Sequence, residues 1–173
     1  MPSYRIRPAQ EGDLETIVDI YNEEVLHGTA TFDTDPFTVE ERAPWFFAHE
    51  LGDAAYTGNH PLLVAVDDAD RVVGYACLSE YRLKPGYSHT VELSIYVAHD
   101  ARRQGVGRLL LDTVLDLARN NPQVHMVLSL IVDGNAVSIR MHEDAGFTRV
   151  GVTHETGYKF GRWYDDATYE LRV

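Results

Sequence analysis

The chain has 173 residues, with 15 Lys and Arg against 27 Asp and Glu, so its formal net charge is −12. This length is typical of a single domain spanning 1–173, and a hydrophobic content of 45% is enough for a continuous core. A nucleic-acid-binding or lipid-binding protein would need a basic face, so this acidic composition disfavours both classes.

Several sequence features bear on location and metal binding. No apolar run approaches the roughly 20 residues of a membrane helix, and the start of the chain lacks an apolar signal region. Cys77 is the only cysteine, which excludes an internal disulfide and a cysteine-cluster zinc site. The eight histidines show no His-x-x-x-His spacing. We therefore expect a cytoplasmic protein without a metal ion.

A strand and a helix are the first elements expected along the chain. Polar and apolar residues alternate over 3–7, which is typical of a strand. Apolar residues recur at helical spacing from Leu14 to Val25, and Gly28 is a helix stop. A polar loop over 29–37 is expected to follow.

A second helix and a β-hairpin come next. Thr38-x-x-Glu41 is a capping-box pattern, which predicts a helix from Thr38 through about Leu51. The apolar runs 62–66 and 72–79 are separated by a polar turn, so they predict a β-hairpin.

The second half of the chain alternates strands with helices. Clean alternation over 91–97 predicts a strand whose odd-numbered residues face one way, whereas Glu92 faces the other. The elements expected after it are a helix at 107–118, a strand at 126–132, a helix at 135–145 and strands at 147–153 and 167–173. This order predicts an α/β (α+β) fold, with helices on a mixed sheet.

A glycine-rich segment joins the strand at 91–97 to the following helix, and it reads Arg102-Arg103-Gln104-Gly105-Val106-Gly107. Backbone N–H groups at a helix start have no internal partner, and glycines let an anion approach them closely. The segment lacks the Gly-Lys-Ser/Thr of a Walker A loop and the third small residue of a dinucleotide fingerprint. It favours a small anionic ligand over a plain turn with solvated arginines.

Two motifs in this order resemble the Gcn5-related N-acetyltransferase (GNAT) family over nearly the whole chain. The first is Arg102-x-x-Gly105-x-Gly107 after a strand, and the second is Asn135-x-x-Ser138-x-x-Met141-His142-x-x-x-Gly146-Phe147. Five shorter segments are similar to the phosphinothricin and methionine sulfoximine/sulfone N-acetyltransferase branch: Thr31-Phe32-Asp33, Tyr81-Arg82, Val91-Glu92, Tyr96-Val97 and Gly157-Tyr158-Lys159.

The resemblance implies a mostly antiparallel GNAT sheet in which the central strands 91–97 and 126–132 splay apart around acetyl-CoA, the co-substrate. It implies that backbone of Ile95, Tyr96 and Val97 pairs with the pantetheine, and that Asn135 and Ser138 also contact the cofactor. The pyrophosphate is expected on the N–H groups of Arg103, Gln104, Gly105, Val106, Gly107 and Arg108.

Glu92 and His142 are the candidate catalytic residues. Acetyl transfer requires a neutral amine, and a half-buried carboxylate such as Glu92 is suited to take the proton. Without the motif, a carboxylate turned to solvent would be the preferred interpretation of Glu92. His142 stands where many family members have a Tyr that protonates the leaving thiolate. An imidazole there either donates that proton, bonds to the sulfur, or merely packs in a helix.

Arg82, Tyr87 and Phe32 are the candidate acceptor-binding residues. An arginine fork matches a carboxylate, so an amino acid would place its carboxylate on Arg82 and its amine toward Glu92. Phe32 would close the pocket. The alternatives are a solvated loop charge for Arg82 and ordinary packing for the two aromatic residues.

These features predict an enzyme that acetylates the α-amine of a small amino acid or analogue, such as phosphinothricin, methionine sulfoximine or methionine sulfone, and so confers antibiotic or herbicide resistance. Polyamine, aminoglycoside or protein N-terminal acetylation and a non-catalytic CoA sensor are the alternatives. Residues 1–86 hold 16 acids and 6 bases, which favours a polycation. Surface fields decay over about 8 Å, so the local charge of Arg82 weighs more.

The same branch resemblance bears on assembly. Members of the branch are often homodimers with shared active-site walls, so a homodimer is expected here. Tyr158 and Lys159 would then reach a partner's site, with plain surface packing as the alternative.

Overall fold

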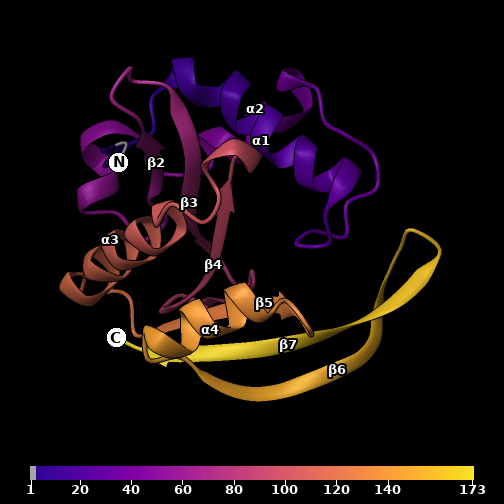
Figure 1. Ribbon diagram of the computed structural model, residues 1–173. Helices are drawn as coiled ribbons and strands as arrows, with labels where there is room; N and C mark the ends of the chain where they lie inside the picture. The colour runs from indigo at the N-terminus through magenta and orange to yellow at the C-terminus, as the bar shows by residue number, and fades with distance from the viewer. Residues whose placement is uncertain (1–2) are drawn as a thin grey trace.

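The computed structural model describes residues 3–173, which form one seven-stranded sheet flanked by helices (Figure 1). Its strands lie in the order β1-β2-β3-β4-β5-β7-β6, and every neighbouring pair is antiparallel except β4 with β5. The strands are β1 Arg5–Pro8, β2 Leu62–Val66, β3 Val72–Glu80, β4 Thr90–Val97, β5 Met126–Val132, β6 Thr148–Lys159 and β7 Arg162–Arg172. The predicted mixed, mostly antiparallel sheet is confirmed.

Within the described residues, four α-helices cover the two faces of the sheet: α1 Leu14–His27, α2 Val39–Phe47, α3 Val106–Asn120 and α4 Ala136–Asp144. Buried residues of α1 and α2 pack with one set of strand side chains, and those of α3 pack with the alternate set, with α4 beside them. None of the helices within residues 3–173 combines the length and apolarity needed to cross a bilayer.

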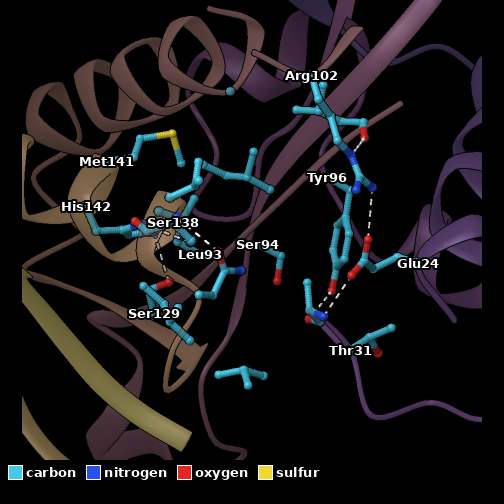
Figure 2. A pocket seen from close by; sticks show the side chains of 18 of the residues that line it. Glu24, Thr31, Leu93, Ser94, Tyr96, Arg102, Ser129, Ser138, Met141 and His142 are labelled. Atoms are coloured by element: carbon cyan, nitrogen blue, oxygen red, sulfur yellow. Dashed lines mark hydrogen bonds and ion pairs between the residues drawn. The ribbon is translucent and has the colours of Figure 1, made fainter. Parts of the chain in front are cut away.

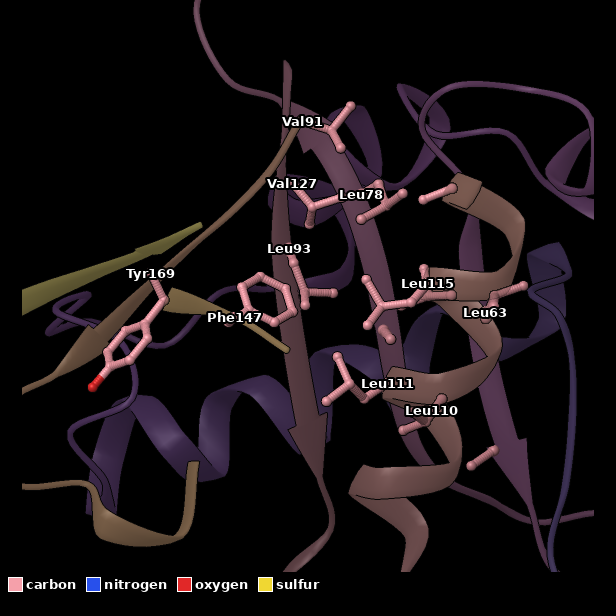
Figure 3. Packing of buried hydrophobic residues seen from close by; sticks show 14 of the residues in the cluster. Leu63, Leu78, Val91, Leu93, Leu110, Leu111, Leu115, Val127, Phe147 and Tyr169 are labelled. Atoms are coloured by element: carbon pink, nitrogen blue, oxygen red, sulfur yellow. The ribbon is translucent and has the colours of Figure 1, made fainter. Parts of the chain in front are cut away.

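The apolar stripe of α3 anchors it on the sheet (Figure 3). Leu110, Leu111 and Leu115 are fully buried and belong to the same cluster as Leu78 of β3 and Leu93 of β4. Fully burying one such leucine contributes about 1.5–3 kcal/mol, so these contacts hold the start of α3 close to the end of β4.

The central strands β4 and β5 diverge. Their parallel pairing covers only Thr90–Glu92 against Met126–Leu128. Beyond it, β4 stays paired with β3 as far as Val97, and β5 stays paired with β7 as far as Val132. The facing edges of the two strands are therefore open to a ligand. This geometry confirms the predicted splay.

The last two strands are much longer than predicted. The predicted strands covered 147–153 and 167–173, whereas β6 and β7 form a long hairpin that extends beyond the rest of the sheet (Figure 1). Its turn has Phe160 and Gly161 at φ of 50° and 76°, as a two-residue hairpin turn requires. Most of β6 is exposed, so the alternation of buried residues that marks a strand is missing there.

The second helix begins as predicted but ends earlier. The capping box is confirmed, since Glu41 N donates to Thr38 Oγ1 at 3.2 Å and Thr38 N donates to a Glu41 carboxylate oxygen at 2.9 Å. The helix ends at Phe47 and not near Leu51. Glu50 pairs with the backbone just before β2, and this contact requires an extended chain.

Candidate active site

A cavity of about 890 Å³ opens where β4 and β5 diverge (Figure 2). Its walls come from these two strands, the loop after α1, the loop before α3, and α4. Ligand sites are commonly cavities of roughly 300–1,000 Å³, so this one has the size of a binding site. The predicted site residues that line it are Phe32, Glu92, Ile95, Tyr96, Val97, Arg103, Gly105, Gly107, Arg108, Asn135, Ser138 and His142.

Two predicted cofactor residues turn their side chains away from the cavity. Gln104 accepts a hydrogen bond from Tyr4 Oη at 2.6 Å and donates one to Asp100 O at 2.7 Å. Val106 is buried in the core with α3. Only the backbone of these two residues is left for a ligand.

Arg82 and Tyr87 lie in the loop before β4 and are not among the residues that line the cavity. The Arg82 guanidinium carbon lies 4.8 Å from the ring centre of Tyr81 and 5.3 Å from that of Tyr87. Such cation–π contacts orient an exposed arginine. The structure thus places Arg82 and Tyr87 in contact with each other in one exposed cluster, separate from the predicted site residues that line the cavity.

The turn before α3 is shaped as an anion cradle. Gly105 caps the helix at φ 87°, and a Cβ added there would meet no atom within 4 Å. Gly107 also lines the cavity. The first N–H groups of α3 have no partner within the helix, so they are free to bind an anion. Because Gly105 and Gly107 have no side chain, an anion can approach these N–H groups closely.

The arginines of this turn differ in their partners. Arg102 pairs with Glu24 at 2.9 Å, and Arg108 pairs with Asp112 at 2.8 Å. Within residues 3–173, Arg103 has no ion-pair partner. Two of the three arginines at this turn, Arg102 and Arg108, are therefore neutralised by carboxylates of the same chain.

Glu92 projects from β4 toward the face that α1 and α2 cover, and it lies across from Ser79 of β3. Its side chain is half-buried, and burial raises the pKa of the Glu92 carboxyl above its ordinary value. Its carboxylate makes no hydrogen bond or ion pair within the described part of the chain, 3–173, and Glu92 lines the cavity.

His142 is buried in the wall formed by α4. Its Nδ1 lies 2.8 Å from Ser138 O, and its Nε2 lies 3.1 Å from Ser129 Oγ (Figure 2). A carbonyl oxygen only accepts, so we assign the proton to Nδ1, and the Ser129 hydroxyl donates to Nε2. Burial lowers the pKa of His142, which keeps the imidazole neutral at pH 7.

Ser129 and Glu24 are two of the cavity residues that the sequence patterns did not single out. Ser129 is a hydroxyl residue within the apolar run of β5, and Glu24 is an acid on the buried face of α1. In both cases the available signal was a polar residue at a position where the pattern places an apolar one. Buried polar groups of this kind need specific partners.

Lys159 points into its own chain, whereas the expectation that it reaches a partner's site required an outward-pointing side chain. It is 3% exposed, and its Nζ donates to Glu24 O at 3.1 Å and to Thr31 O at 2.9 Å, both of the same chain. Tyr158 and Trp163 are exposed on the hairpin, with ring centres 4.7 Å apart.

A sheet that opens beside its one parallel pair, with a glycine turn at the end of the opened strand, is the architecture of an N-acetyltransferase domain. Among residues 3–173 no group of three or more His, Cys, Asp or Glu side chains is placed to hold a metal ion. The acetyltransferase (GNAT) domain family matches residues 6–168. The chain belongs to this family and is an N-acetyltransferase. The resemblance of its motifs is thereby confirmed.

Similar proteins cover nearly the whole chain. A phosphinothricin N-acetyltransferase of Streptomyces coelicolor is 41% identical over 96% of this chain and 94% of its own. An L-methionine sulfoximine/L-methionine sulfone acetyltransferase of Pseudomonas paraeruginosa is 39% identical over 99% and 95%. A phosphinothricin acetyltransferase of Sinorhizobium meliloti, solved in complex with acetyl-CoA, has a TM-score of 0.88 and 33% identity over 98% and 88%.

Proposed function

We propose that this chain transfers the acetyl group of acetyl-CoA to the α-amine of a small amino acid or analogue of the phosphinothricin, methionine sulfoximine or methionine sulfone type. The observation that carries the proposal is one continuous cavity that contains both the anion cradle at Gly105 and the carboxylate of Glu92. The substrates of similar proteins support the acceptor class.

The residues of the opened sheet fit acetyl-CoA. Beyond Glu92, the edge of β4 that faces β5 has no strand partner, and Ile95, Tyr96 and Val97 line the cavity there, so this segment offers unpaired backbone groups to the pantetheine amides. The turn 103–108 offers N–H groups to the pyrophosphate, and Asn135 and Ser138 line the same cavity.

The proposed reaction is direct transfer. The amine nitrogen forms a bond to the thioester carbonyl carbon, the carbon–sulfur bond breaks, and CoA leaves as a thiolate that takes up a proton. The amine must lose a proton for this attack, and Glu92 accepts it, directly or through a water. The raised pKa of Glu92 makes its carboxylate a stronger base than an exposed glutamate.

The geometry of His142 favours a proton acceptor over the proton donor, which was one of the three roles left open for this residue. Its one ring proton is held by Ser138 O, and its free lone pair faces the Ser129 hydroxyl. A hydroxyl in this position passes a proton to Nε2 if it receives one from the cavity. His142 with Ser129 is therefore a second candidate for the base, beside Glu92.

This assignment of His142 predicts a pH dependence. The lowered pKa keeps His142 neutral, so wild-type kcat should hold above about pH 7 and fall on acidification as His142 and Glu92 take up protons. The measurement is kcat against pH at saturating substrates. A rise in kcat on acidification through about pH 6 would show that protonated His142 donates a proton, contrary to this assignment.

A mutation tests the acetyl-CoA cradle. Gly105→Ala places a Cβ where the phosphate would approach, so we expect calorimetry to give an acetyl-CoA Kd at least about tenfold higher, the worth of one hydrogen bond to a charged group. Alanine at positive φ also costs about 1–2 kcal/mol of folding stability. Gly161→Ala is the matched control, because Gly161 has φ 76° and equal free space at the hairpin turn. Equal Kd values for the two variants would contradict the cradle.

An acceptor panel tests the function as a whole. CoA thiol release should be fastest with methionine sulfone, methionine sulfoximine, phosphinothricin or an ordinary amino acid. Faster release with spermidine, an aminoglycoside or a peptide N-terminus would move the assignment to that alternative. No release with any amine, together with tight acetyl-CoA binding, would favour a CoA sensor.

The proposal includes a cytoplasmic homodimer with a role in resistance to such amino-acid analogues. The exposed rings of Tyr158, Phe160 and Trp163 on the projecting hairpin support an interface there. Sedimentation of the wild type beside a Trp163→Ser variant measures it, and a wild type that sediments as a monomer would contradict the dimer.

A further inference from the structure

The loop after α1 forms one wall of the cavity, and Glu24 holds it. Thr29, Ala30, Thr31 and Phe32 all line the cavity; we name this segment, 29–32, the wall loop. One carboxylate oxygen of Glu24 accepts a hydrogen bond from Ala30 N at 2.9 Å. Ordering a loop costs conformational entropy, so a fixed wall needs such bonds.

The other carboxylate oxygen of Glu24 bonds to Arg102, on the same side of the cavity as Thr31 (Figure 2). It pairs with Arg102 Nη2 at 2.9 Å, and Arg102 Nε donates to Val97 O at 3.1 Å (Figure 2). The guanidinium is therefore held between the end of β4 and Glu24. One side chain, Glu24, thus links the wall loop to the turn that forms the anion cradle.

Lys159, at the end of β6, hydrogen-bonds to the wall loop. Its two hydrogen bonds bridge the backbone of α1, at Glu24 O, to that of the wall loop, at Thr31 O. Burial lowers the pKa of Lys159, while the nearby carboxylates of Glu24 and Asp33 favour its charged form. A buried ammonium is retained only with such partners.

Packing leaves the loop little freedom. Tyr96 Oη donates to Ala30 O at 3.4 Å, so both polar groups of that residue are bound. An added Cβ at Gly157 would overlap the Phe32 ring, and one at Gly28 would overlap the Glu24 carboxylate. The loop therefore fits closely between α1, β4 and the turn end of the β6–β7 hairpin.

We propose that Glu24 and Lys159 are positioning residues that hold the wall loop, and with it Phe32, in the geometry that the amine acceptor requires. Arg102 serves the same purpose through Glu24, so it orients the wall loop in place of binding phosphate. This inference rests on the proposed function, in which the acceptor lies between Phe32 and Glu92. Neither Glu24 nor Lys159 takes part in the chemistry.

The test compares Lys159→Met and Glu24→Gln with the wild type. Methionine keeps the apolar stem of Lys159 and removes both hydrogen bonds, and glutamine keeps the shape of Glu24 while removing its charge. Acceptor kcat/KM should fall about 10- to 100-fold in Lys159→Met, because a small displacement of a positioning group costs that much. The calorimetric Kd of acetyl-CoA should stay within about twofold of the wild-type value. The control is Arg149→Met, which breaks the ion pair of Arg149 with Asp133, outside the cavity lining.

Amide hydrogen exchange of the free protein provides a readout that needs no acceptor. The Ala30 amide should exchange faster in Lys159→Met and in Glu24→Gln than in the wild type and the control. If exchange and acceptor kcat/KM are both unchanged, or if acetyl-CoA Kd weakens as much as kcat/KM, the inference is wrong. If Lys159→Met does not fold, Glu24→Gln carries the same comparison. A wild type that acetylates no amine overturns the proposed function, while the exchange rates still decide whether these residues hold the loop.

Discussion

Replacing Glu92 with Gln is expected to lower kcat about 10²–10⁴-fold, the usual contribution of a positioned general base. Glutamine keeps the shape of the side chain but accepts no proton at working pH. Acetyl-CoA affinity should not change, because the proposed cofactor contacts lie beyond Glu92 on β4 and in the turn before α3. The measurements are steady-state kcat and calorimetric acetyl-CoA Kd.

The pH dependence of wild-type activity tests the same role of Glu92. Burial raises the pKa of Glu92, and the active form is the deprotonated one. Activity should therefore be complete above this raised pKa and should be lost as the pH falls through it. Glu80→Gln is the control, since Glu80 is an exposed carboxylate at the end of the neighbouring strand β3. Near-full activity of Glu92→Gln at neutral and alkaline pH would show that His142 with Ser129, or water, accepts the proton.

Replacing Arg82 with Ala is expected to lower kcat/KM for an amino acid about 10- to 150-fold, the worth of a hydrogen bond to a charged group, about 1.5–3 kcal/mol. Converting the acceptor carboxylate to an amide should cost the wild type a similar factor. In Arg82→Ala the amide should lose little more, because both changes remove one contact. Independent effects would add instead.

The position of Arg82 in the structure bears directly on this test. The guanidinium lies on the rings of Tyr81 and Tyr87, and Arg82 is not among the residues that line the cavity. An acceptor must therefore extend toward it from Glu92. Arg119→Ala is the control, because Arg119 is an exposed arginine at the end of α3. Equal slowing of the free acid and the amide by Arg82→Ala would mean that the arginine only shapes its loop.

Elements that bury one face were predictable from the chain alone. The apolar stripe of α3 and the alternation in β4 appear directly in the sequence, because each pattern records which side chains leave water. The start of α2 was predictable for a similar reason, since Thr38 and Glu41 cap it within one turn. The alternation of β4 also placed Glu92 on the face opposite Val91 and Leu93, but only the family motif predicted that its side chain lies in the cavity.

Elements without a buried face were not predictable in this way. Most of β6 is exposed and shows no periodic burial, and the contacts that hold the end of the β6–β7 hairpin, such as those of Lys159 with Glu24 and Thr31, come from distant parts of the chain. The end of α2 depends on Glu50 pairing with the segment before β2, a contact that the local pattern does not contain.

The partners of the charged and polar side chains in the cavity were decided by tertiary structure. Arg102 begins the glycine-rich motif, and its side chain pairs with Glu24, 78 positions away. Lys159 reaches Thr31 across 128 positions, and Ser129 meets His142 from another element. The periodic spacing of apolar residues along the chain predicts which side chains are buried, because burial depends on the polarity of each residue and on its position in a helix or strand. Ion pairs and hydrogen bonds depend on which distant residue the fold brings within about 3 Å, so only the folded chain determines them.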